Sequence, residues 1–74
     1  MNDHDEGDDE ATRLAKARLT ELRQEHLDLG AAVNALAEQH NPDMILVARM
    51  KKRKLALRDQ IVLLENQLIS DIIA

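Results

Sequence analysis

The residues most able to do chemistry are basic side chains gathered in residues 49–58, where the run MKKRK is followed by a further arginine. Lysine and arginine in such a cluster can contact phosphates, an interaction that supplies most of the non-specific affinity of proteins for nucleic acids. The candidate polyanion contacts are Arg49, Lys51, Lys52, Arg53, Lys54 and Arg58.

On a helix, at 100° per residue, these six cations divide between two sides and do not form one narrow stripe. The chain also lacks Phe, Tyr and Trp, the side chains on which nucleic-acid bases stack. We therefore interpret the cluster as the solvated flank of a packed helix, and we keep a nucleic-acid-associated protein as the alternative. The two groups of cations are Arg49, Lys52 and Arg53, and Lys51, Lys54 and Arg58.

His26 falls on the apolar stripe of its helix, where a histidine can act as a pH switch or as a metal ligand. The chain has no cysteine and no second histidine at ligand spacing. We therefore interpret His26 as a core polar residue that sets the specificity of helix packing. The sequence also contains no catalytic triad, glycine-rich phosphate loop or metal-binding motif. It predicts no enzyme activity, no cofactor, and no catalytic, cofactor-binding or metal-binding residue.

The first ten residues, MNDHDEGDDE, carry six carboxylates and no lysine or arginine, so the rest of the chain has ten basic against eight acidic residues. This composition predicts a disordered acidic tail over residues 1–10, which could attract the basic segment within one molecule or between subunits. The tail lacks the pattern of a secretory signal, and no apolar run approaches the roughly 20 residues that span a bilayer. We expect a soluble, cytoplasmic protein without membrane contact.

Apolar residues then repeat at alternating intervals of three and four, the heptad pattern of a coiled coil. The only proline interrupts this pattern: Pro42 disfavours a helical Asn41 but suits the first turn of a new helix, with Asn41 or Asp43 as its N-cap. We predict helices over residues 11–39 and 43–73 with a turn at residues 40–42. Because the turn is so short, the fold is all-α, an antiparallel two-helix coiled-coil hairpin. The predicted seam positions are Thr12, Ala15, Leu19, Leu22, His26, Leu29, Val33, Leu36 and His40 on the first helix, and Val47, Met50, Lys54, Leu57, Ile61, Leu64 and Leu68 on the second.

Pairing of positions equidistant from the turn sets Leu19 near Leu64 and Lys54 near Leu29. Lys54 would then keep its alkyl stem on Leu29 and its ammonium group in water. Gly30 lies inside the first helix, at a cost of about 1 kcal/mol relative to alanine. It marks either a surface where another helix approaches closely or a locally tolerated residue.

The second helix carries more apolar surface than one neighbouring helix can cover. A second apolar row runs beside its seam and widens the stripe over residues 61–73. We expect this surface to mediate self-association, most simply as a dimer of hairpins that forms a four-helix bundle. The predicted interface residues are Leu55, Val62, Ile69, Ile72 and Ile73.

Two stretches, ELRQEHLDLGAAVNAL (21–36) and MKKRKLALRDQIVLL (50–64), resemble the YdcH-like family of small bacterial proteins, a domain of unknown function. The resemblance implies a bacterial, cytosolic helical hairpin that tends to self-associate, and it implies little about activity. Together with the apolar surplus, it favours a non-enzymatic interaction or adaptor protein. Its expected partners are another copy of itself and another protein recognised by helix packing.

Overall fold

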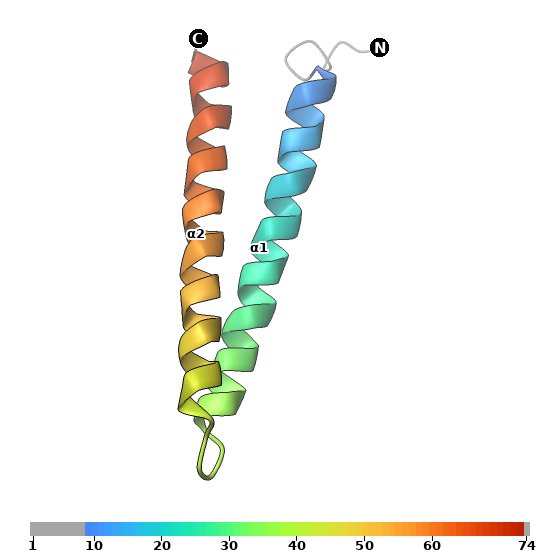
Figure 1. Cartoon of the computed structure of the whole chain (residues 1–74). Coiled ribbons are helices and arrows are strands. Elements are labelled where there is room, and N and C mark those ends of the chain that lie inside the picture. Colours follow the sequence, from blue (N-terminus) through green and yellow to red (C-terminus); the bar gives the residue numbers. More distant parts are fainter. Residues whose placement is uncertain (1–8, 74) are drawn as a thin grey trace.

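The computed structural model describes residues 9–73, with side chains for residues 9–70. Two long helices, α1 (Glu10–Ala37) and α2 (Met44–Ile73), lie side by side and run in opposite directions (Figure 1). No strand occurs within the described residues. The predicted all-α antiparallel hairpin is therefore confirmed. Residues 1–8 of the predicted acidic tail lie outside the described residues.

Helix α1 begins one residue earlier than predicted because Asp9 acts as its N-cap. The Asp9 Oδ1 accepts a hydrogen bond of 2.8 Å from the backbone N–H of Thr12, while Asp9 itself has an extended backbone. This bond satisfies one of the N–H groups that a helix leaves unpaired at its start. The same backbone hydrogen bond from Thr12 is the main cause that lowers the pKa of the Asp9 carboxyl below its ordinary value.

The turn is longer than predicted, because α1 ends at Ala37 and not at residue 39. Asn41 has a left-handed backbone with φ of 55°, a conformation that asparagine tolerates better than most residues and that a helix cannot continue through. His40 was predicted as the last seam position of the first helix, but it lies exposed beyond the helix end. The reversal of the chain thus occupies residues 38–43.

Helix α2 begins after Asp43, which settles the choice between the two possible N-caps. The Asp43 Oδ1 accepts hydrogen bonds of 3.1 Å from the backbone N–H groups of both Ile45 and Leu46. The sequence had suggested that Pro42 stands in the first turn of the second helix. In the structure Pro42 instead precedes the Asp43 cap. The left-handed Asn41, Pro42 and the Asp43 cap together set where α2 starts.

The core of the hairpin is the predicted heptad seam. Every seam position within α1 and from Val47 to Leu68 on α2 is buried or half-buried. Val47, beside the turn, keeps only 1% of its surface exposed and is the most buried residue between residues 9 and 70. The buried apolar side chains are Leu19, Leu22, Val33, Val47, Leu57 and Leu68.

Candidate functional site

The basic segment lies on the continuous helix α2, so its cations divide between two sides as predicted. Arg53 faces Glu25 of α1, with 4.0 Å between Nη2 and Oε2, on the side that also carries Asp28. Arg49 and Lys52 are exposed to solvent. Lys51, Lys54 and Arg58 lie on the other side, where they line one groove between the helices. Three of the six candidate polyanion contacts therefore share one groove.

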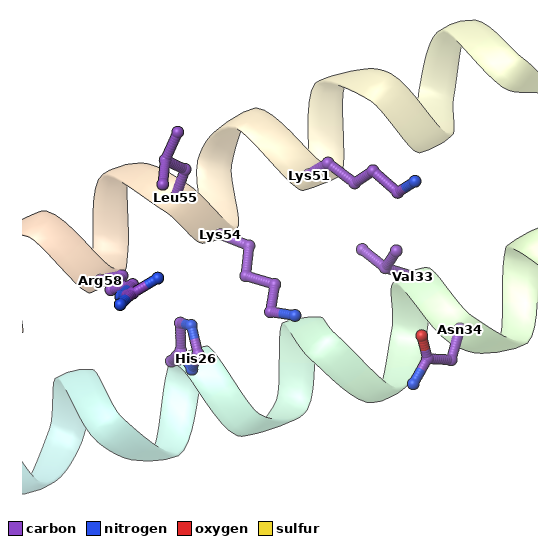
Figure 2. A pocket seen from close by; sticks show the side chains of 7 residues that line it. All are labelled: His26, Val33, Asn34, Lys51, Lys54, Leu55 and Arg58. Atoms are coloured by element: carbon purple, nitrogen blue, oxygen red, sulfur yellow. The ribbon is translucent and has the colours of Figure 1, made fainter.

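This groove, which we call the basic groove, has a volume of about 540 Å³ and is open to solvent. Lys54 extends from α2 across to the α1 backbone, and His26 points from α1 toward Arg58 (Figure 2). No carboxylate lines the groove, and within residues 9–70 no carboxylate forms an ion pair with its lysines or arginine. The lining residues are His26, Val33, Asn34, Lys51, Lys54, Leu55 and Arg58.

Gly30 faces Lys54 between the two helices. A Cβ atom built on Gly30 would lie 3.5 Å from Cε and 3.7 Å from Nζ of Lys54, which is ordinary van der Waals contact. The lysine stem therefore lies over Gly30 but leaves room for a Cβ atom, so this contact does not require glycine. Within the hairpin, the contact favours the interpretation of Gly30 as a locally tolerated residue, because only the flexible end of Lys54 approaches it.

An apolar row adjoins the basic groove along α2. We define it as Leu55, Val62 and Ile69, which are seven residues apart and keep 56%, 45% and 54% of their surface exposed. Leu27 on α1 is 67% exposed and borders a further groove of about 430 Å³ that Val62 also lines. The structure thus leaves uncovered the row that the sequence predicted as an interface. The side chains of Ile72 and Ile73, predicted in the same interface, lie outside the described residues.

An ion pair that the sequence analysis missed crosses between the helices on the same side. Arg23 Nη2 lies 2.6 Å from Glu65 Oε2, and both side chains line the groove beside Leu27 and Val62. A signal was present in the sequence, because each residue follows a seam leucine or isoleucine by four positions. Such flanking positions commonly form salt bridges between the helices of a coiled coil.

The match to a known family covers most of this surface. The family described as a protein of unknown function (DUF465) matches residues 19–65, more than half of the chain. The chain belongs to this family. Neither the comparison with curated proteins nor the comparison with solved structures found a match.

The DUF465 match includes the whole basic groove, the Arg23–Glu65 pair and two members of the apolar row. Ile69 lies beyond its end. The family description assigns no activity. Cations along the basic groove and an aliphatic row beside it suit an amphipathic helix, which could cover the apolar row and pair with the cations.

Within its described residues, the chain contains neither a cluster of metal-ligating side chains nor a membrane-spanning helix. In residues 9–70, no group of three or more His, Cys, Asp or Glu side chains is placed to hold a metal ion. His26 is half-buried at the seam position that the sequence predicted, with Arg58 beside it and no carboxylate in the basic groove. Neither helix, over its described residues, is long and apolar enough to cross a membrane.

Proposed function

We propose that this DUF465 protein is a non-enzymatic, cytoplasmic coiled-coil interaction protein that self-associates through α2. The exposed apolar row carries the proposal. In a two-helix hairpin the seam is already covered by the opposite helix, yet Leu55, Val62 and Ile69 keep about half of their surface in water. Regular exposed apolar rows of this kind are typical of surfaces that pack against another protein.

The energetic argument favours a helical partner. Covering the exposed half of each side chain in the row contributes about 1 kcal/mol per residue. A seven-residue spacing presents the row as one nearly straight ridge, and a helix that packs along the ridge covers all three residues at once. Adaptor function toward further proteins would use the same kind of helix packing.

Sedimentation equilibrium of the full chain at micromolar concentration tests this function. We expect a dimer or a larger oligomer for the wild type and a shift to monomer for Val62→Asp, because a carboxylate in the interface would lose its hydration. Leu63→Asp is the matched control, since Leu63 is 62% exposed but lies 100° further round α2. A folded wild-type monomer at this concentration would refute the proposal.

A second candidate function, nucleic-acid association, is favoured by one observation. Lys51, Lys54 and Arg58 converge on a groove without any described carboxylate. Three phosphate contacts on a single strand predict a slope of about −2 in a plot of log K against log salt concentration. Fluorescence anisotropy with labelled single-stranded RNA measures it, and Lys54→Glu should weaken binding more than the control Lys52→Glu. Absence of binding at low salt excludes this candidate.

A further inference from the structure

The apolar row is symmetric about its central residue. Leu55 and Ile69 each lie seven residues from Val62, which at 1.5 Å per residue is about 10.5 Å along the axis in each direction. A second copy of α2 that packs antiparallel, with the twofold axis at Val62, brings Leu55 against Ile69 of the partner copy. Every member of the row then meets an aliphatic side chain.

The charges beside the row are complementary in this same register. Arg58 lies four residues before Val62 and Glu65 three residues after it, so antiparallel packing places Arg58 within about 1.5 Å of the axial height of Glu65 of the partner copy. Arg58 pairs with no carboxylate inside residues 9–70, whereas Glu65 already holds Arg23 at 2.6 Å. Glu65 would thus accept hydrogen bonds from one arginine of each copy.

Other registers match less well. Parallel packing sets Arg58 at the height of Arg58 of the partner copy and Glu65 at the height of Glu65, and like charges at one height repel. Antiparallel registers shifted by three or four residues place the aliphatic row against Arg58 and Glu65. The register about Val62 combines apolar with apolar and cation with anion, as self-complementary twofold interfaces require.

From this self-complementarity we infer that two hairpins dock through antiparallel α2 helices about a twofold axis at Val62, with Leu55 packed on Ile69 and Arg58 paired with Glu65 of the partner copy. This inference rests on the proposed self-association and specifies its geometry. Leu27 of α1, beside Val62 in the same groove, lies at the border of the resulting four-helix bundle.

Single cysteines test the register, because the natural chain has none. A disulfide needs two Cα atoms within about 7 Å of each other. We expect Val62→Cys to form a disulfide-linked dimer on mild oxidation. Leu55→Cys and Ile69→Cys should each stay uncrosslinked alone, because the two equivalent cysteines of the dimer lie about 21 Å apart along the axis. A mixture of the two variants should crosslink, because position 55 of one copy then faces position 69 of the other. Leu63→Cys is the control that should stay uncrosslinked.

Charge reversal provides an independent test by sedimentation. Arg58→Glu alone and Glu65→Arg alone should each weaken the dimer about tenfold, because two attractive pairs per dimer become repulsive. An equimolar mixture of the two variants should restore the affinity, since each heterodimer regains two opposite-charge pairs. The control Arg49→Glu makes the same change in charge on another side of α2 and should leave the affinity unchanged.

The outcomes separate this inference from the proposed function. A wild-type dimer in which Leu55→Cys crosslinks with itself, or in which the mixture of Leu55→Cys and Ile69→Cys fails to crosslink, overturns the antiparallel register and leaves self-association standing. Equal affinity of Arg58→Glu and the wild type likewise overturns the charge pairing. A monomeric wild type overturns both the register and the proposed function.

Discussion

The guanidinium of Arg23 and the carboxylate of Glu65 lie 2.6 Å apart and join α1 to α2 across 42 residues of sequence. Both side chains retain solvent contact, with 56% and 37% of their surface exposed. Water and salt therefore screen the attraction between Arg23 and Glu65, so the ion pair contributes little to the stability of the hairpin. Its main effect is to fix the positions of these two side chains at the groove beside Leu27 and Val62.

A double-mutant cycle measures the contribution of this ion pair. We expect Arg23→Ala and Glu65→Ala to show a coupling free energy of about 0.2–1 kcal/mol in urea unfolding, falling at high salt. The matched exposed pair is Arg18 and Glu21, which are three residues apart on α1 with 3.3 Å between Nη1 and Oε1. A coupling of several kcal/mol would mean that the pair is shielded from water in solution, as in a dimer that covers it.

Gly30→Ala should stabilise the protein. A Cβ atom at Gly30 meets Lys54 at ordinary contact distance, so nothing opposes the better helix propensity of alanine. We expect the free energy of unfolding to rise by about 1 kcal/mol. The reverse change at the next residue, Ala31→Gly, should lower it by a similar amount because Ala31 is exposed. A loss of stability in Gly30→Ala would show that the position of Lys54 is constrained.

Asp43→Ala should destabilise the start of α2. The side chain caps two backbone N–H groups, and loss of an aspartate cap costs about 1 kcal/mol. Thermal unfolding followed by circular dichroism measures the effect. Asp59→Ala, which removes an exposed carboxylate in the middle of α2, should change the stability much less.

The Asp9 cap should make stability depend on pH in the acidic range. Its hydrogen bond from Thr12 lowers the pKa of Asp9 in the folded state, so the folded protein binds the proton more weakly than the unfolded chain. The cap therefore stabilises the protein above the unfolded pKa of about 3.9 and loses this effect as pH falls through the folded pKa. The difference in melting temperature between the wild type and Asp9→Ala should shrink between pH 5 and pH 2. A difference independent of pH would show that the charge of Asp9 does not contribute.

The periodicity of the sequence determined both helices and which side chains form the seam, and the short connection at Pro42 determined that the helices pack antiparallel. Such information is local: apolar residues at intervals of three and four place themselves on one face of a helix before any neighbour is present. For the same reason, the division of the basic segment into two sides followed from helical geometry alone, and the exposed row of Leu55, Val62 and Ile69 was recognisable as surplus.

Only the tertiary structure decided how the flanks of the two helices meet. The axial offset between α1 and α2 depends on the turn, where the left-handed Asn41 and the Asp43 cap lengthen the connection beyond the predicted three residues. That offset sets Lys54 over Gly30 and Arg23 against Glu65, because a shift of one helix by a single turn would change every such neighbour. Periodicity specifies which face of each helix is buried. Which side chains meet across the two helices depends also on the axial offset between α1 and α2, which periodicity does not give.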